Sequence, residues 1–369
     1  MIAVRAPGKL FIAGEWAVLE KGSPGIVAAV DKYVFAEIAK SGRIEVSVDD
    51  FGITGAVADF DGSELSWHGG LGKEQEDRLK FVRAAIEASL QYLGQHQPFQ
   101  LRTYGKEMQQ MVGGRKQKIG FGSSAASVVA IVTAILAFHG REIKTKGAKD
   151  TIFKLAAIAH YLAQGKSGSG FDIAASVYGG YFLYTRFDAE WLAGELATGG
   201  VKQVVDSAWP GLLVEKLEGL DGMQLLVCWT KEEADTRTMV QQMQAFKAAN
   251  PTGYHGVISS IGACVAKLAE SWQRENRQAI TEQLRQNRRL LAELTAKSGV
   301  PIETGQLKAL AEIAEQHGCA GKLSGAGGGD CGIAVCFDAP AAAAVTKGWK
   351  AAGLHPLKVS ANQAGVAQV

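Results

Sequence analysis

A short run of small residues near the middle of the chain has the composition and spacing of an anion-binding loop. The run, here called the first glycine loop, is Gly120-Phe121-Gly122-Ser123-Ser124-Ala125-Ala126. Two glycines let the backbone approach a bulky anion, and successive N–H groups can form a cradle. A helix beginning here presents its positive end to the same point, and Ser123 or Ser124 can cap it. The run predicts a phosphate site, with one hydroxyl well placed for Mg²⁺ or a phosphate oxygen.

The spacing of the first glycine loop excludes two common nucleotide motifs. The chain contains no G-x-x-x-x-G-K-[ST] sequence, so the loop is not a Walker A motif. Ala125 stands where the dinucleotide fingerprint has its third glycine. For this segment taken alone, a serine-capped helix after a tight turn is an alternative explanation.

A second glycine loop ends in a carboxylate. Its sequence is Gly165-Lys166-Ser167-Gly168-Ser169-Gly170-Phe171-Asp172. A carboxylate at the end of a pliable loop and close to a lysine can orient a nucleophile or pair with a catalytic cation. The alternative is a surface loop in which Asp172 caps the following tract at 173–177.

A third glycine loop lies near the C-terminus. Its sequence is Ser324-Gly325-Ala326-Gly327-Gly328-Gly329-Asp330. Four glycines in five positions make a plain turn less favourable, because each glycine adds conformational entropy to the unfolded chain. We expect this loop to wrap a ligand or to pack against the first glycine loop.

A lysine follows a rigid turn close to the N-terminus. Lys9 comes directly after Pro7 and Gly8, and a lysine fixed in this way can bind phosphate as a point charge or stabilise charge that develops during transfer. His139 and His160, in or near predicted helices, are interpreted as packing or surface residues.

Alternating strand and helix patterns surround these loops and predict an α+β protein of two domains. We expect strands at 25–30, 33–39, 44–48, 98–103, 181–185 and 224–229. We expect helices at 77–93, from the first glycine loop to about 139, and at 151–163, 236–249, 257–295 and 304–317. Residues 113–118 are predicted to be a flexible basic loop. A break at 197–210 suggests domains spanning 1–205 and 206–369.

Composition limits the class of protein. The chain has 369 residues, of which 47% are hydrophobic, and this composition favours a globular fold. Its net charge of +2 lacks the strong basic excess that is typical of nucleic-acid-binding proteins. The cysteines number five, and no pair has C-x-x-C spacing, so we expect neither a zinc ribbon nor a disulfide framework. The N-terminus does not match a signal peptide, and the longest apolar stretch is too short to span a membrane. A cytoplasmic protein is expected.

Taken together, the motifs resemble the GHMP kinases, the family of galactokinase, homoserine kinase, mevalonate kinase and phosphomevalonate kinase. They occur in the family's order: Ala6-Pro7-Gly8-Lys9-Leu10, the first glycine loop, and Lys322-Leu323-Ser324-Gly325-Ala326-Gly327-Gly328-Gly329. Segments 8–19, 168–180 and 324–333 resemble the phosphomevalonate kinase branch. The resemblance covers nearly the whole chain. It implies the two-domain GHMP fold, with an N-terminal domain like ribosomal protein S5 domain 2 and a ferredoxin-like C-terminal domain.

The resemblance also implies a role for each loop. ATP is expected along Gly120, Phe121, Gly122, Ser123, Ser124, Ala125 and Ala126, with Mg²⁺ near Ser124. Lys9 and Asp172 are expected to face the transferred γ-phosphoryl group. The anionic acceptor is expected near Lys118, Ser169, Gly170, Gly325, Ala326, Gly327, Gly328 and Arg288.

The implied reaction transfers the γ-phosphoryl group of ATP to 5-phosphomevalonate, which gives mevalonate diphosphate, an isoprenoid precursor, and ADP. The acceptor oxygen ionises with a second pKa of ~6, so we expect Asp172 to orient Lys9 or a metal and not to act mainly as a base. One alternative is mevalonate kinase or another small-molecule kinase of the family, because the glycine loops indicate ATP use better than they indicate the acceptor. Another is a non-catalytic sensor of the same fold, although the chain keeps Lys9, Asp172 and the serines.

Overall fold

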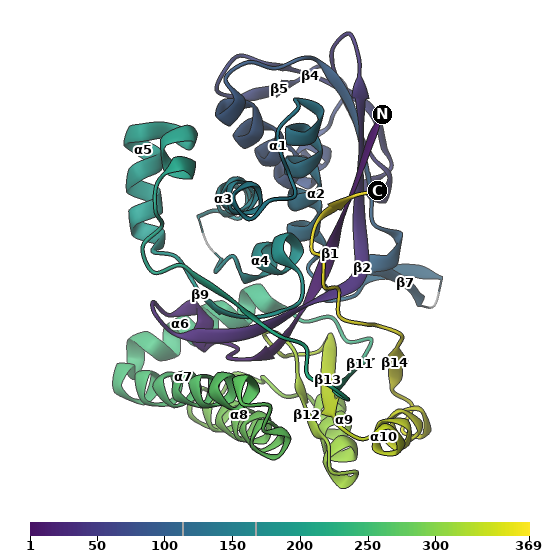
Figure 1. Cartoon of the computed structure of the whole chain (residues 1–369), viewed down its shortest axis with the longest axis vertical. Coiled ribbons are helices and arrows are strands. Elements are labelled where there is room, and N and C mark those ends of the chain that lie inside the picture. The colour runs from purple at the N-terminus through teal and green to yellow at the C-terminus, as the bar shows by residue number, and fades with distance from the viewer. Residues whose placement is uncertain (113, 167) are drawn as a thin grey trace.

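A large mixed sheet with helices packed against it forms most of the first half of the molecule (Figure 1). The computed structural model describes residues 1–112, 114–166 and 168–369, so Gly113 and Ser167 lie outside the described residues. Within that part of the chain, nine strands join this sheet: β1 (Ile2–Ala13), β2 (Pro24–Lys40), β3 (Ile44–Val48), β4 (Ile53–Phe60), β5 (Leu65–Trp67), β6 (Phe99–Tyr104), β9 (Tyr181–Thr185), β10 (Leu213–Leu217) and β15 (Ala367–Gln368). β1 and β2 pair antiparallel along almost their full length and form its centre.

Five α-helices and three short 3-10 helices belong to this half of the described chain. They are α1 (Lys73–Leu93), α2 (Ser123–Phe138), α3 (Lys146–Ala163), α4 (Phe171–Tyr178), α5 (Ala189–Asp206), η1 (Ala17–Leu19), η2 (Asp49–Phe51) and η3 (Lys106–Met108). Helix α2 contacts β1 and β2 on one side and α1 and α3 on the other. Its residues are apolar around almost the whole circumference, as expected of a fully buried helix.

The second half of the chain forms a smaller sheet and a set of long helices (Figure 1). In the described residues its four strands lie in the order β12 (Ala320–Leu323), β13 (Cys331–Cys336), β11 (Gln224–Trp229) and β14 (His355–Leu357). The helices are α6 (Thr236–Ala249), α7 (Pro251–Gln273), α8 (Arg277–Ser298), α9 (Gly305–Gln316) and α10 (Ala339–Ala351). The α+β prediction is confirmed.

Two predicted elements were wrong in their extent. The single helix expected at 257–295 is divided between α7 and α8, because Glu275 has a left-handed backbone and Asn276 caps the second helix. The basic segment at 113–118 is not a loop throughout: β7 (Gln109–Val112) and β8 (Arg115–Lys118) form a hairpin. Charged residues in a two-stranded ribbon lack an apolar alternation, so the sequence did not indicate this strand.

Beyond the predicted boundary, the chain adds one more strand to the larger sheet before it enters the smaller one. Helix α5 runs through most of the expected break at 197–210, and β10 then pairs with β9 in the larger sheet. The C-terminal strand β15 returns to pair with β1, which brings the two termini close together (Figure 1). The division at 205/206 therefore stays a prediction.

No disulfide framework was expected, but one pair of cysteines is bonded. Cys319 and Cys336 form a disulfide, with their Cα atoms 4.8 Å apart. Because Ala320 pairs with Val335 in the β12–β13 ladder, Cys319, directly before β12, lies opposite Cys336 at the end of β13. This register is a three-dimensional property that the cysteine spacing did not reveal. Cys228, Cys264 and Cys331 are free and buried.

Candidate active site

Strand β1 brings Lys9 directly against the first glycine loop. The Lys9 ammonium donates to the carbonyl of Gly120 at 2.8 Å, and its backbone N–H donates to the carbonyl of Phe121 at 2.9 Å. A Cβ atom on Gly8 would lie 2.7 Å from that same Phe121 carbonyl oxygen. Glycine at position 8 is therefore required for the close approach. The prediction of a turn before Lys9 was wrong, because Pro7 and Gly8 lie within β1, at a register shift in its pairing with β2.

A glycine, and not a serine, caps helix α2. Gly122 is the N-cap residue, with φ 76°, and no side chain caps the helix. Ser123 and Ser124 lie inside the first turn, so the prediction that they cap the helix was wrong. The N–H groups of a first turn have no partner within their own helix. Without a capping side chain, these groups suit an anion placed at the helix N-terminus.

The Ser124 hydroxyl has an unexpected neighbour in His160. Its Oγ lies 3.3 Å from Nε2 of His160 in helix α3. His160 is buried, and its ring centroid lies 4.9 Å from that of Phe81. It therefore packs in the interior, as expected, but it also touches a predicted ATP-binding residue. The two residues are 36 positions apart in the sequence, so spacing gave no indication of this contact.

Helix α4 places Asp172 beside Gly122, which the side chain of Lys9 also approaches. A Cβ atom on Gly122 would lie 3.2 Å from Cε of Lys9 and 3.8 Å from Cβ of Asp172. The Asp172 carboxylate also accepts from the N–H of Ile173 at 3.0 Å. The Ser176 hydroxyl donates to the carbonyl of Pro7 at 2.7 Å, which fixes α4 against β1. The structure thus brings together Lys9 and Asp172, which are 163 positions apart (172 − 9) in the sequence.

The end of the second glycine loop is fixed by a buried tyrosine. The Tyr184 hydroxyl donates to the carbonyl of Ser169, and a Cβ atom on Gly170 would lie 3.0 Å from that hydroxyl. Burial raises the pKa of Tyr184 well above its ordinary value, and the nearby Asp172 carboxylate adds to the effect. Tyr184 is therefore a neutral hydrogen-bond donor at neutral pH, and it holds the loop that carries Asp172.

The third glycine loop is tied to the residues that follow Lys9. The N–H of Phe11 donates to Oγ of Ser324 at 2.9 Å, and the indole of Trp16 donates to the carbonyl of Ala326 at 3.2 Å. The structure confirms that this loop also packs against the first glycine loop, through the carboxylate of Asp330 and Gly120.

Two glycines of the third loop face the protein interior. A Cβ atom on Gly327 would lie 2.1 Å from the carbonyl oxygen of Ile302, and one on Gly328 would lie 2.6 Å from Sδ of Met239. Gly325, by contrast, has open space where its Cβ would be. The side of the loop at Gly325 thus has room for a ligand, whereas Gly327 and Gly328 are required for internal packing.

A buried ion pair beneath the third loop was not identified from the sequence. Lys322 pairs with Glu15, and each side chain is 1% exposed. The Lys322 ammonium also donates to the carbonyl of Leu323 at 2.7 Å. Burial lowers the pKa of Lys322, and the Glu15 carboxylate opposes that shift. Both residues stand inside the motifs quoted above, but only the fold shows that they meet.

Two predicted acceptor ligands, Lys118 and Arg288, have neighbours outside the three glycine loops. The Lys118 side chain is exposed, and its ammonium lies 5.8 Å from the ring centroid of Phe51. Arg288 pairs with Glu303 at 2.8 Å and with Glu315 at 2.9 Å, and its side chain is only 14% exposed. These ion pairs join α8 to the segment around α9. They give Arg288 a structural role and argue against its assignment to the acceptor.

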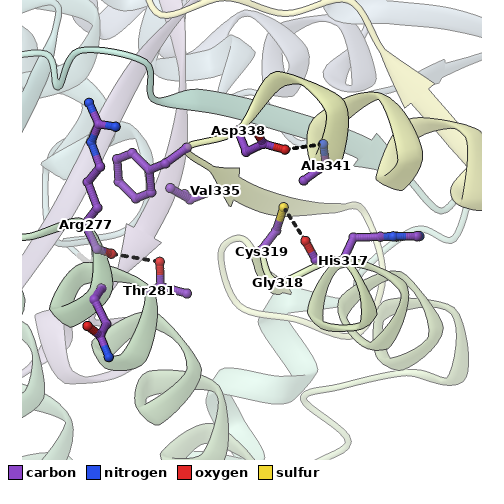
Figure 2. A pocket seen from close by; sticks show the side chains of 10 residues that line it. Arg277, Thr281, His317, Gly318, Cys319, Val335, Asp338 and Ala341 are labelled. Atoms are coloured by element: carbon purple, nitrogen blue, oxygen red, sulfur yellow. Dashed lines mark hydrogen bonds between the residues drawn. The ribbon is translucent and has the colours of Figure 1, made fainter.

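A cavity of about 370 Å³ in the C-terminal half is separate from these loops (Figure 2). It lies between the start of α8, the turn at His317 and the start of α10, and Asp338 there accepts from the N–H of Ala341. The residues lining it include the disulfide cysteine Cys319 but no member of the three glycine loops. It is therefore not the site predicted from the sequence.

The residues around Gly122 fit a nucleotide phosphate. A glycine-lined backbone, an uncapped helix N-terminus and one lysine ammonium supply N–H donors and positive charge at one point. Within the described residues, no cluster of three or more His, Cys, Asp or Glu side chains is arranged to hold a metal. Mg²⁺ in kinases is commonly held by one or two protein ligands together with substrate phosphates. Ser124 and Asp172 are compatible with that mode.

Comparisons with known proteins show the family to which the chain belongs. Residues 80–180 match the family described as GHMP kinases N terminal domain, and residues 273–354 match GHMP kinases C terminal. The chain belongs to the GHMP kinase family. It is 34% identical to a phosphomevalonate kinase of a Streptomyces species, over 99% of this chain and 98% of that protein.

Two solved structures share the whole fold. A Listeria innocua protein superposes with a TM-score of 0.89 and 32% identity, covering 100% of this chain and 99% of that one. Streptococcus pneumoniae phosphomevalonate kinase, in complex with phosphomevalonate and AMPPNP, superposes with a TM-score of 0.80 and 30% identity, covering 98% and 100%. In the described residues, no helix is long and apolar enough to span a bilayer.

Proposed function

We propose that this chain is a phosphomevalonate kinase. It transfers the γ-phosphoryl group of ATP to the phosphate of (R)-5-phosphomevalonate and releases mevalonate 5-diphosphate and ADP in the cytoplasm. The similarity along the full length to a phosphomevalonate kinase supports the substrate. The observation that carries the chemistry is the convergence of Lys9 and Asp172 on Gly122, at the uncapped N-terminus of α2.

The first glycine loop binds the phosphates of ATP. Main-chain N–H groups at the start of α2 donate to phosphate oxygens, and the helix N-terminus adds a favourable partial charge. The absence of side chains at Gly120 and Gly122 makes room for the Asp330 carboxylate and for the Lys9 side chain beside the proposed phosphate site. Ser123 and Ser124 offer hydroxyls in the same turn, and Ala125 and Ala126 pack inward. Phe121 is buried, so its contribution is made through the backbone.

Lys9 offsets the repulsion between the two phosphates. An oxygen of the acceptor phosphate attacks the γ-phosphorus, and the bond from that phosphorus to the β-phosphate bridging oxygen breaks, so that ADP leaves with that oxygen. The repulsion between the acceptor phosphate and the phosphates of ATP is greatest where the two substrates meet. A lysine ammonium at this point lowers the barrier by electrostatic stabilisation.

Asp172 orients Lys9 or a bound cation. An alcohol acceptor needs a base, but a phosphate acceptor with a second pKa of ~6 is already mostly ionised at neutral pH. Mg²⁺, when bound, neutralises charge on the β- and γ-phosphates, and Ser124 and Asp172 are its proposed protein ligands. The acceptor is proposed to lie along Lys118, Ser169, Gly170, Gly325 and Ala326.

The test is ADP release measured with four acceptors side by side: 5-phosphomevalonate, mevalonate, homoserine and galactose. We expect turnover with 5-phosphomevalonate to exceed turnover with the other three by at least ~100-fold in kcat/KM, because a site built for a charged phosphate loses charge-assisted hydrogen bonds with the others. A preference for mevalonate would reassign the chain to mevalonate kinase. Absence of turnover with every acceptor would support a non-catalytic sensor.

A further inference from the structure

Asp330 is a non-glycine residue in a backbone conformation that favours glycine. Its φ is 57°, and Gly327, Gly328 and Gly329 before it also have positive φ values of 83°, 73° and 138°. A side chain in the left-handed region carries a conformational cost that glycine avoids. Strain of this kind is often retained at functional sites, where the surroundings fix it. The acidic side chain at position 330 therefore calls for an explanation beyond the turn itself.

Hydrogen bonds on both sides fix the Asp330 backbone. Its carbonyl accepts from the N–H and from the hydroxyl of Thr230, each at 2.9 Å. Its N–H donates to the carbonyl of Glu232 at 2.8 Å. These bonds connect it to the segment after β11. Because the backbone is fixed in this way, the direction of the Asp330 Cα–Cβ bond is fixed as well.

The Asp330 carboxylate covers Gly120, the residue that accepts from Lys9. A Cβ atom on Gly120 would lie 2.9 Å from Oδ2 of Asp330 and 3.0 Å from its Cγ. The Lys9 ammonium donates to the Gly120 carbonyl at 2.8 Å. Burial raises the pKa of Asp330, the Lys9 charge lowers it, and Glu233 raises it further. Asp330 and Lys9 therefore interact electrostatically beside Gly120.

We propose that Asp330 is a positioning residue for phosphoryl transfer, which holds Lys9 and the start of the first glycine loop from the C-terminal half of the molecule. The inference rests on the proposed function. A lysine stem has four rotatable carbon–carbon bonds, so a single carbonyl acceptor leaves its ammonium considerable freedom. The Asp330 carboxylate lies beside the Gly120 carbonyl and attracts the Lys9 ammonium. This attraction restricts the ammonium to the side of the loop where the phosphates meet. Asp330 is not a phosphate ligand, because an anion is repelled by both substrates.

The experiment compares Asp330→Asn and Asp330→Gly with a matched control, Glu275→Gly. Asp330→Asn removes the charge and keeps the shape, whereas Asp330→Gly also relieves the left-handed backbone. Glu275 is exposed, also has a left-handed backbone, with φ 52°, and lies in the turn between α7 and α8. Each variant is measured for melting temperature, kcat, and KM for ATP and 5-phosphomevalonate.

We expect both Asp330 variants to lower kcat by about tenfold or more, with each KM changed less than about threefold, because ground-state binding does not depend on this contact. Asp330→Gly should melt no lower than the wild type, and Glu275→Gly should keep both its kcat and its melting temperature. Failure of the wild type to turn over 5-phosphomevalonate would reject the proposed function. With an active wild type, a kcat within twofold in either Asp330 variant, or a loss of kcat explained by a lower melting temperature, would overturn the inference.

Discussion

Two side chains contributed by different elements converge on the proposed reaction centre. Lys9 comes from a strand and Asp172 from the first turn of a helix, and both approach the space beside Gly122. In the proposed reaction this arrangement provides a positive charge where the two phosphates approach each other.

Replacing Asp172 tests whether it orients or acts as a base. We expect Asp172→Asn to lower kcat by about 10- to 100-fold, because Lys9 or the bound cation is no longer oriented. The shape of the pH profile should stay unchanged. The acid limb should still follow the acceptor phosphate, whose second pKa is ~6. A general base must be ionised, so a base role predicts that the variant loses the acid limb together with its activity. The measurement is kcat against pH for both proteins.

Lys118 is the exposed cation nearest in sequence to the first glycine loop. If it binds the acceptor, Lys118→Met should raise KM for 5-phosphomevalonate by about tenfold, the loss expected for one charge-assisted contact. KM for ATP should change by less than about threefold. An equal rise in KM for both substrates would reject the assignment. The Lys118 side chain would then contact the ATP phosphates, or it would act only through its packing against the ring of Phe51.

The element on which the site depends most is the N-terminus of α2. Its N-cap glycine provides a positive φ, leaves the first-turn N–H groups uncapped, and makes room for Lys9. The sequence predicted this helix end, because glycines before an apolar run have a clear physical meaning, and the phosphate site there stays a prediction. It did not show which residue is the cap, since serine and glycine are both common there.

Gly122→Ala tests this helix end, with Gly299→Ala as its control. Both glycines have left-handed backbones, with φ 76° and 75°, but a Cβ on Gly299 meets nothing within 4 Å. We expect each change to cost about 1–2 kcal/mol of unfolding free energy. Only Gly122→Ala should also lower kcat/KM, by about 100-fold, because the new Cβ displaces Lys9. Equal activity in the two variants would contradict the account.

Strand and helix positions were predicted well where periodicity was strong. The strands at 181–185 and 224–229 match β9 and β11 residue for residue. The turn between α7 and α8 was missed because Glu275 adopts its positive φ without glycine or proline to mark it. The Cys319–Cys336 pairing depends on strand register, which the cysteine count does not contain.

At the scale of the whole molecule, contacts between the two halves hold the glycine loops together. The buried Glu15–Lys322 pair joins the end of β1 to β12, and Ser324 and Ala326 make hydrogen bonds to the same N-terminal segment. No sequence pattern predicted these contacts, because the two hydrogen bonds join residues that are 313 and 310 positions apart in the chain. They explain how a loop near the C-terminus can be part of a site that begins at Lys9.

A double-mutant cycle measures how much this ion pair contributes. Lys322→Met leaves the Glu15 carboxylate buried and unpaired, and it should cost about 3–5 kcal/mol of unfolding free energy. Adding Glu15→Leu should recover most of that loss, because an apolar pair replaces the ions. Lys297→Met, which removes the exposed pair with Glu293, is the control and should change stability by no more than about 1 kcal/mol. A double variant as unstable as the sum of its singles would show that the two residues do not interact.

The central claim is that main-chain N–H groups at the start of α2 hold the triphosphate while Lys9 faces the transferred group. The most direct measurement is a crystal structure of the chain with a non-hydrolysable ATP analogue and 5-phosphomevalonate. We predict that the γ-phosphate lies beyond the N-terminus of α2, with one of its oxygens ~3 Å from the Lys9 ammonium and the acceptor phosphate on its far side. A γ-phosphate bound far from both Lys9 and Asp172 would contradict the account.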